Sequence, residues 1–171
     1  MPNVLLLGDP GTGKSSWLYR LKGYKFTMSY MATIGKDTHI LRKNDRNVII
    51  HDMGGHERFR SVTQSYYDLA DGALIFYDVT NKESKEKLEF WKNKITKDIP
   101  ILIIANKKDL DKDNIDYIDF LISCKQDENI SWVLDELLKD IPHTPEEPTI
   151  LEQLLETFYL YYIRYYNRFL T

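Results

Sequence analysis

Short runs of apolar residues alternate with amphipathic stretches along most of the chain. The apolar runs predict strands, and the weakest of them is expected to form a hairpin with the next run through Lys-Asn-Asp. The predicted strands are Asn3–Asp9, Thr38–Arg42, Asn47–Asp52, Gly72–Val79, Ile101–Asn106 and Asp119–Cys124. The predicted helices are Lys14–Lys22, Arg58–Leu69, Lys82–Thr96 and Glu128–Ile141.

Strands that alternate with helices form mostly parallel sheets with helices on both faces. The pattern therefore predicts an α/β fold with a mostly parallel six-stranded sheet flanked by helices. Ligands of such sheets bind beyond the carboxyl ends of the strands. The residues with the most distinctive chemistry follow these predicted ends, so we expect the site there.

Composition narrows the function classes. The chain has 171 residues, which suits one domain, and its net charge of −3 does not favour a nucleic-acid partner. The single cysteine, Cys124, excludes a disulfide framework and a cysteine zinc cluster, and it favours a reducing compartment. The first residues lack the pattern of a signal peptide, and no apolar run approaches the ~18 residues of a membrane span. We expect a cytoplasmic protein.

Residues 8–15, GDPGTGKS, fit the phosphate-loop pattern G-x-x-x-x-G-K-[ST] between a predicted strand and a predicted helix. Glycines let backbone N–H groups surround phosphates, and the helix N-terminus adds the positive end of its dipole. Lys14 would reach the β- and γ-phosphates, and the Ser15 hydroxyl would bind Mg²⁺, which prefers hard oxygen ligands. An ordinary glycine turn is the alternative, but the strand, lysine and serine together argue against it.

Asn106–Asp109, NKKD, follows one apolar strand, and Ser123–Lys125, SCK, ends the next. NKKD resembles the guanine-specificity motif of small GTPases. The Asp109 carboxylate can accept two hydrogen bonds from guanine, a donor pair that adenine lacks. Lys107 would lie along the base or ribose, and N–H groups near Cys124 would contact the guanine oxygen. A solvated turn is the alternative for NKKD alone, and its position after a phosphate loop weakens that alternative.

The motifs GDPGTGKS, ATIGKD, DMGGHE, NKKD and SCK occur in the order found in the Rab family of Ras-like small GTPases. The segment ERFRSVTQSYYDLADGALIFYDVTNKES resembles the switch II region of that family and the strand after it. The resemblance covers about residues 3–141. It implies the P-loop small GTPase fold, bound GTP or GDP with Mg²⁺, and a GTP/GDP-dependent switch in vesicle trafficking.

The resemblance assigns roles to further residues. Phe26 should stack on the guanine, although a core aromatic is the alternative, and Tyr30 should close over the phosphates. Thr33 should bind Mg²⁺ and γ-phosphate, Asp52 should hold Mg²⁺ through water, and the Gly55 N–H should sense γ-phosphate. The metal-binding set is then Ser15, Thr33 and Asp52. The nucleotide-binding set is Pro10, Gly11, Thr12, Gly13, Lys14, Ser15, Ser16, Phe26, Tyr30, Thr33, Gly55, Asn106, Lys107, Asp109, Ser123, Cys124 and Lys125.

Several positions depart from the family pattern. His56 stands where the family has its water-positioning glutamine, and Pro10 occupies a usually small position beside the γ-phosphate. Proline has no N–H and its ring fills space, so an arginine finger from an activating partner should fit poorly. His51 and Thr38 replace two members of the aromatic surface that Rab effectors contact, whereas Tyr66 keeps the third. The effectors of other Rabs therefore cannot be assigned to this chain.

Three functions compete. The first is an enzyme that hydrolyses GTP slowly, with Lys14 and His56 as catalytic residues and Mg²⁺ offsetting developing charge. The second is a nucleotide-binding pseudo-GTPase that acts as a protein-interaction module, which Pro10 and His56 favour. The third, a P-loop kinase or ATPase, is disfavoured by NKKD and SCK. For His56 itself, a solvated loop histidine without a role is the alternative.

Two larger departures lie downstream. Asn106 and Ser123 are only 123 − 106 = 17 positions apart, so the fourth helix of the family is expected to be reduced or absent, which would uncover one flank of the sheet. After the small GTPase domain (1–141) and a Pro-rich connector (142–148), residues 149–171 predict an amphipathic helix with a capping box at Thr149 and Glu152. Its apolar stripe is Leu151, Leu154, Leu155, Phe158, Tyr162, Tyr165, Tyr166 and Phe169.

We expect this aromatic helix to pack on the domain, and a membrane-surface or partner helix is the alternative. The chain ends in Phe-Leu-Thr, so we expect no prenyl anchor, and recruitment to membranes would go through a partner. Effectors and exchange or activating proteins are expected to bind the switch regions 26–38 and 53–67, and we expect a monomer.

Overall fold

The computed structural model describes residues 1–29, 31–56, 65–110 and 118–142. These residues form a six-stranded sheet in the order β2-β3-β1-β4-β5-β6. The described ladders are parallel except the β2–β3 hairpin, so the predicted mostly parallel sheet is confirmed. The strands are β1 (Asn3–Leu7), β2 (Lys36–Lys43), β3 (Arg46–Met53), β4 (Gly72–Asp78), β5 (Ile101–Asn106) and β6 (Phe120–Leu121).

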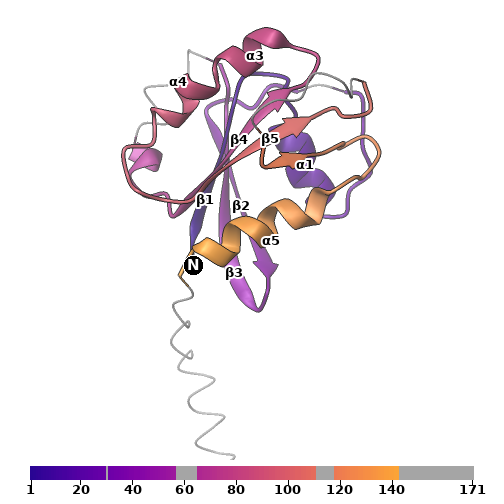
Figure 1. Ribbon diagram of the computed structural model, residues 1–171. Coiled ribbons are helices and arrows are strands. Elements are labelled where there is room, and N and C mark those ends of the chain that lie inside the picture. Colours follow the sequence, from indigo (N-terminus) through magenta and orange to yellow (C-terminus); the bar gives the residue numbers. More distant parts are fainter. Residues whose placement is uncertain (30, 57–64, 111–117, 143–171) are drawn as a thin grey trace, which may run out of the picture.

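Helices cover both faces of the sheet (Figure 1). The elements α1 (Lys14–Leu21) and α5 (Ile130–Asp140) lie on one face, and α3 (Lys82–Glu86) and α4 (Leu88–Lys92) lie on the other. Strand side chains alternate between these faces. In β1, Val4 and Leu6 join the core under α1 and α5, whereas Leu5 and Leu7 join the core under α4.

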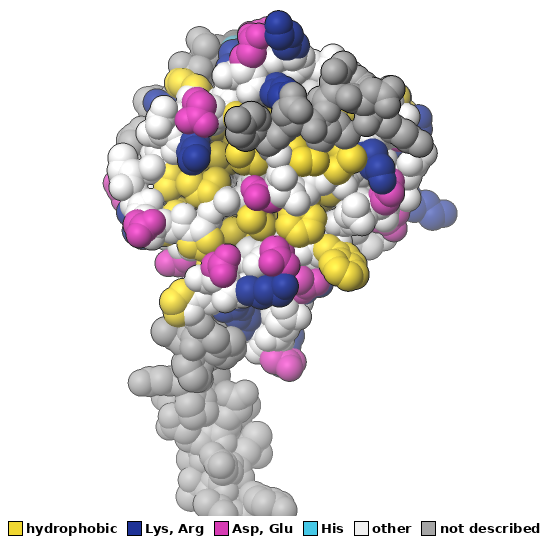
Figure 2. Space-filling view, viewed as in Figure 1, with side chains coloured by type: hydrophobic (Ala, Val, Ile, Leu, Met, Phe, Trp, Pro, Cys, Tyr) yellow, Lys and Arg dark blue, Asp and Glu magenta, His cyan; other side chains and the backbone are white. Residues whose placement is uncertain are grey.

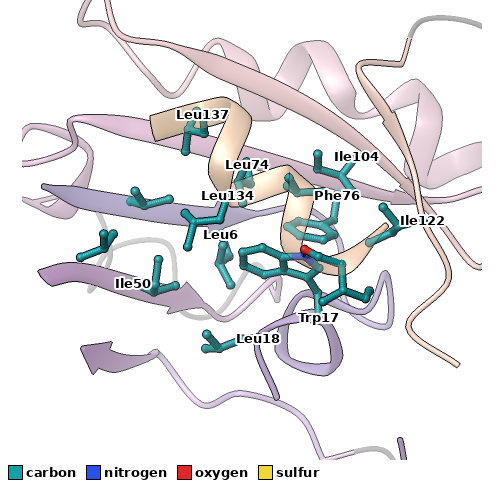
Figure 3. Close-up of a cluster of buried hydrophobic side chains, with 14 of the residues drawn as sticks. Leu6, Trp17, Leu18, Ile50, Leu74, Phe76, Ile104, Ile122, Leu134 and Leu137 are labelled. Atoms are coloured by element: carbon teal, nitrogen blue, oxygen red, sulfur yellow. The ribbon is translucent and has the colours of Figure 1, made fainter. Parts of the chain in front are cut away.

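Trp17 is the central side chain of the first core, which Figure 3 shows in close-up. It is fully buried, and its ring lies 5.6 Å from that of Phe76 in β4. Its indole N–H donates to the carbonyl of Ile130, at the start of α5, at 3.0 Å. This hydrogen bond satisfies the polar atom that burial of a tryptophan would otherwise leave unpaired. Trp17 thus joins α1, the sheet and α5.

The structure divides the predicted helix Lys82–Thr96 into α3 and α4, with Lys87 at the break (φ −84°, ψ 1°). Backbone hydrogen bonds from Lys87 N to Glu83 O and from Trp91 N to Lys87 O continue the helical pattern on either side. The apolar spacing is preserved across the break, so periodicity alone could not reveal it.

Other boundaries also differ from the prediction. The helix predicted to end at Thr96 ends at Lys92, and the last strand and the last helix are both shorter than expected. The last strand was predicted as Asp119–Cys124, but β6 is limited to Phe120–Leu121. The reason is a closed turn: Ser123 and Glu128 exchange backbone hydrogen bonds of 3.2 and 3.0 Å, which ends the ladder with β5. Asn129 then adopts a left-handed conformation, and α5 begins at Ile130 rather than at the predicted Glu128.

Some predictions fall on residues that the structure does not describe. The predicted helix Arg58–Leu69 is helical at 65–67, while 57–64 lie outside the described residues. The reduced fourth helix concerns 111–117, and the connector beyond Pro142 and the aromatic helix concern 143–171, which are also outside them. These remain predictions. Among the described residues, no helix is long and apolar enough to cross a membrane.

Several apolar side chains along β5 and β6 are only partly buried, whereas Ile104 and Ala105 are fully buried. Figure 2 shows hydrophobic side chains at the surface across the middle of the face presented in Figure 1, around β5 and above α5. Among the partly buried residues of these two strands are Ile101, Leu102, Ile103, Phe120 and Leu121.

The buried guanidinium of Arg46, at the start of β3, caps the C-terminal end of α5. It donates to the carbonyls of Leu138 and Ile141, the latter at 3.1 Å, and the residue is 7% exposed. The last carbonyls of a helix lack intrahelical partners and carry the negative end of its dipole. Arg46 thereby connects the β2–β3 hairpin to the C-terminal end of α5.

We predict that Arg46→Met lowers the free energy of unfolding by about 1–3 kcal/mol, because two buried carbonyls lose a charged donor. Urea unfolding followed by circular dichroism measures this change. Arg42→Met is the matched control, since that side chain is exposed and its ion pair with Asp45 is long, at 3.9 Å. It should change the free energy by less than ~0.5 kcal/mol. Equal effects of the two substitutions would refute the capping role.

Candidate functional site

Four loops meet beyond the carboxyl ends of the parallel strands. Residues 8–13 follow β1, residues 54–56 follow β3, residues 107–110 follow β5, and residues 123–129 follow β6. The register of the sheet brings the ends of β1, β3, β4 and β5 to one edge. The predicted phosphate, switch and base segments are therefore neighbours in space although they are far apart in sequence.

Backbone geometry explains the glycines of the phosphate loop. Gly13 has φ +93°, and a Cβ there would lie 2.1 Å from Nδ2 of Asn106, so a larger residue does not fit. Gly13 is also the N-cap of α1, and no described side chain caps this helix end. The first N–H groups of α1 are consequently available to an anion, which the helix dipole also favours.

Lys14 opens α1 and is 6% exposed. Its ammonium donates to the backbone carbonyls of Gly8 at 2.8 Å and Asp9 at 3.0 Å, so it lies against the loop that it closes. Burial lowers its pKa to about 8, while the carboxylates of Asp52 and Asp9 act in the opposite direction. A phosphate group bound here would add further negative charge next to this ammonium and favour its protonated form.

Three oxygen-bearing side chains meet beside Lys14. Oδ2 of Asp52 accepts from Ser15 Oγ at 2.5 Å and from Thr33 Oγ1 at 3.2 Å, and the two hydroxyls are 3.1 Å apart. Asp52 is 3% exposed, and its Oδ1 has no hydrogen-bond partner among the described residues. Burial raises the pKa of Asp52, and the hydrogen bond from Ser15 and the charge of Lys14 oppose that rise. Hard oxygens with an unpaired buried carboxylate atom fit Mg²⁺.

On the base side, the Asn106 amide connects three loops. Its Nδ2 donates to the carbonyl of Thr12 at 2.8 Å, while its Oδ1 accepts from the N–H groups of Lys107 at 2.8 Å and Cys124 at 3.3 Å. Burial raises the pKa of the Cys124 thiol to about 12, so this thiol is not a nucleophile. The phosphate loop, NKKD and SCK are thus held by one side chain.

The predicted base acceptor, Asp109, is held in position by the SCK loop. Its Oδ1 accepts from Ser123 Oγ at 2.6 Å, and its Oδ2 lies 3.7 Å from Lys125 Nζ. Lys107 has φ +68°, and its ammonium reaches Asp78 Oδ2 at 2.6 Å. The sequence analysis did not single out Asp78; the available signal was that it ends β4 at the same edge of the sheet.

The switch segments contact the phosphate loop through the backbone. A Cβ on Gly55 would lie 2.5 Å from Gly8 O and 2.6 Å from Pro10 N, so only glycine allows this close approach. The N–H of Gly54 donates to Gly35 O at 2.8 Å, which links the two switch regions. His56 follows and is exposed. Tyr30 lies outside the described residues.

Phe26 is half-buried and packs against the first core. The structure therefore places this ring at the edge of the core that Trp17 centres.

The two replaced aromatic positions form a polar cluster. His51 is buried, with Nδ1 3.1 Å from Thr38 Oγ1 and Nε2 3.1 Å from Asn3 Oδ1. Its ring lies 5.2 Å from that of Tyr66, and Lys36 Nζ lies 4.2 Å from the centre of the Tyr66 ring. Burial, and then the charge of Lys36, lower the pKa of His51, which favours the neutral imidazole.

Comparison with known proteins agrees with this geometry. A model of the Ras family matches residues 3–143. The Ras-related protein Rab-5B of Plasmodium falciparum is 36% identical over 160 residues, which cover 81% of this chain and 76% of the relative. The Ras-related protein Rab-18-B of Danio rerio is 32% identical over 163 residues, covering 83% and 80%. The Ras-related protein Rab-1 of Theileria annulata is 36% identical over 160 residues, covering 80% and 72%.

The family match extends from the first strand to the end of α5 and so includes all four loops of the site. It confirms the resemblance inferred from the motifs. The chain belongs to the Ras family of small GTPases and is a Rab-like GTP hydrolase.

Proposed function

We propose that the protein is a guanine-nucleotide switch with slow intrinsic hydrolysis that acts in vesicle trafficking. Members of its family bind GTP or GDP with Mg²⁺. The observation that carries the proposal is the contact of Thr33 with Ser15 and Asp52. Thr33 belongs to the first switch region, whereas Ser15 belongs to α1 and Asp52 to β3, so their contact links a switch to the proposed metal position.

In the proposed mechanism, the chain positions phosphate and water, because phosphoryl transfer needs little covalent chemistry from the protein. Lys14 and the N-terminal amides of α1 would bind the phosphate oxygens. Ser15, Thr33 and Asp52 would hold Mg²⁺, which would supply positive charge to those oxygens. The Gly55 N–H would contact the γ-phosphate, and His56 would orient the attacking water.

The second candidate is a nucleotide-binding protein without turnover. Two observations favour it. Pro10 brings no N–H to its side of the phosphate loop and lies against Gly55. His56, which is exposed, is shorter than the glutamine that the family has at this position and does not present the same paired amide donor and acceptor. Single-turnover hydrolysis separates the two candidates.

The partner surface is proposed to lie on the two switch regions, as in the family. The polar cluster of His51, Thr38 and Asn3, in which His51 is buried, places hydrogen-bonded side chains where an apolar aromatic surface would stand. An effector that requires three aromatic rings would lose the apolar contacts of two of them. We therefore propose a different set of effectors, and recruitment to membranes through one of them.

We predict selectivity for guanine of ~10³ or more over adenine, because a buried polar acceptor left unmatched costs several kcal/mol. Competition between GTP and ATP for the purified protein measures it. Asp109→Asn should weaken GTP binding and improve binding of xanthosine triphosphate, whose edge offers the acceptor that asparagine can match. The gain for xanthosine shows that the variant is folded. Equal affinity of the parent protein for ATP and GTP would reject the assignment.

We predict that chelation of Mg²⁺ speeds nucleotide release, because the phosphates lose the cation that links them to the protein. Ser15→Ala should release GDP and GTP quickly even with Mg²⁺ present. Thr33→Ala should speed release of a non-hydrolysable GTP analogue but not of GDP, since Thr33 is proposed to bind in the triphosphate state. Release rates that ignore both chelator and Ser15→Ala would contradict the metal assignment.

We predict slow single-turnover hydrolysis that depends on the His56 imidazole, because a ring nitrogen can accept a hydrogen bond from the attacking water and orient it. His56→Gln should change the rate, since glutamine is longer and presents a paired amide donor and acceptor. Single-turnover hydrolysis of bound GTP measures both rates. If His56→Ala hydrolyses GTP at the parent rate, His56 does not position the water, and the non-hydrolysing candidate gains.

A further inference from the structure

The phosphate loop contains an acidic residue, Asp9. A carboxylate in a loop that binds phosphates repels the ligand unless it points away and its charge is compensated. The structure meets both conditions. Asp9 Oδ1 accepts from the indole N–H of Trp91 in α4 at 3.0 Å, and Oδ2 lies 3.0 Å from the ammonium of Lys87. The side chain of Asp9 is only 13% exposed.

The backbone of Asp9 takes part in the geometry of the loop. Its carbonyl accepts from Lys14 Nζ at 3.0 Å and from Thr12 Oγ1 at 2.9 Å. Its carbonyl carbon lies 2.7 Å from the place that a Gly55 Cβ would occupy. A movement of Asp9 would therefore shift the carbonyl oxygen that holds Lys14. It would also shift the backbone against which the second switch region packs.

The two partners of Asp9 are held by other parts of the fold. Trp91 is 4% exposed and belongs to the core between the sheet and α4, where Phe90 packs edge-on against it. Lys87 lies at the break between α3 and α4 and also pairs with Glu83 at 2.7 Å. The break that periodicity did not predict is thus the position from which a lysine reaches the phosphate loop.

We infer that Lys87 and Trp91 are positioning residues of the nucleotide site, which slow nucleotide release by holding Asp9 away from the phosphates. This inference rests on the proposed role of the loop in binding them. Trp91 fixes the direction of the carboxylate with a hydrogen bond, and Lys87 offsets its charge. In this proposal neither residue contacts the nucleotide, and both affect its release through Asp9.

The test compares release of a ribose-labelled fluorescent GDP from the full-length protein and its variants, in Mg²⁺ and excess unlabelled GDP. Lys87→Met keeps the aliphatic stem and removes the charge. Its matched control is Lys82→Met in the same segment, because Lys82 pairs with Glu86 at i, i+4 just as Lys87 pairs with Glu83. Lys87→Met should release GDP about two- to fivefold faster than Lys82→Met, the range for a partly exposed ion pair. Equal rates for the two variants overturn the role of Lys87.

A double-substitution cycle shows whether Lys87 acts through Asp9. In an Asp9→Asn background, Lys87→Met should leave the release rate almost unchanged, because the charge that it compensates is gone. An undiminished effect of Lys87→Met in that background would mean that the ammonium acts on the phosphates directly, and it would overturn the inference. Glu83→Gln leaves the contact with Asp9 in place and should release GDP at the parent rate.

Trp91→Phe tests the hydrogen bond, since it keeps an aromatic ring in the core and removes the N–H. It should speed release severalfold in the Asp9 protein and have a smaller effect in the Asp9→Asn protein, while equal effects in both would assign Trp91 to packing alone. A parent protein that retains no guanine nucleotide would contradict the proposed function instead. A parent that retains GDP, with variants that match their controls, would contradict only the positioning roles.

Discussion

The Asn106 amide is the interaction on which the arrangement of the site depends. It is 2% exposed, and its nitrogen and oxygen hydrogen-bond to three loops that follow three different strands. The close contact of Gly13 with this amide leaves no room for a side chain, so the phosphate loop and the base loops are held at a fixed separation. A nucleotide bound in one conformation has a set distance between its base and its phosphates, and a joint of this kind sets the matching distance in the protein.

This joint is supported by the two cores on either side of the sheet. Side chains are buried along nearly the whole of β1 and β4 and pack into the cores on both faces, which holds these central strands in place and carries their ends to one edge. Trp17 connects the helix after the phosphate loop with the helix after the SCK loop. Arg46 ties the end of that second helix to the β2–β3 hairpin, which carries Asp52 near its far end. Packing at one end of the sheet thus maintains the site at the other.

The charges at the phosphate loop are balanced by a small number of groups. Lys14 is buried against carbonyls, and the carboxylates of Asp52 and Asp9 are both close enough to affect its pKa. Asp52 turns toward the hydroxyls of Ser15 and Thr33, while Asp9 turns away, toward Trp91 and Lys87. The two acids therefore differ in role because their partners differ. One faces the proposed metal position, and the other points away from the proposed phosphate site.

The sequence by itself determined the fold class, the family and the order of the loops. Alternating periods of apolar residues predict strands and helices because they depend only on local geometry, and GDPGTGKS and NKKD are short motifs whose residues act together. Only the tertiary structure decided the break at Lys87, the shortness of β6, and the contacts of Asp78, Trp91 and Lys87 with site residues. These features come from hydrogen bonds between residues far apart in the chain, such as Trp91 and Asp9. Local periodicity carries no information about such pairs, because it is the packing of the sheet and helices that brings them together.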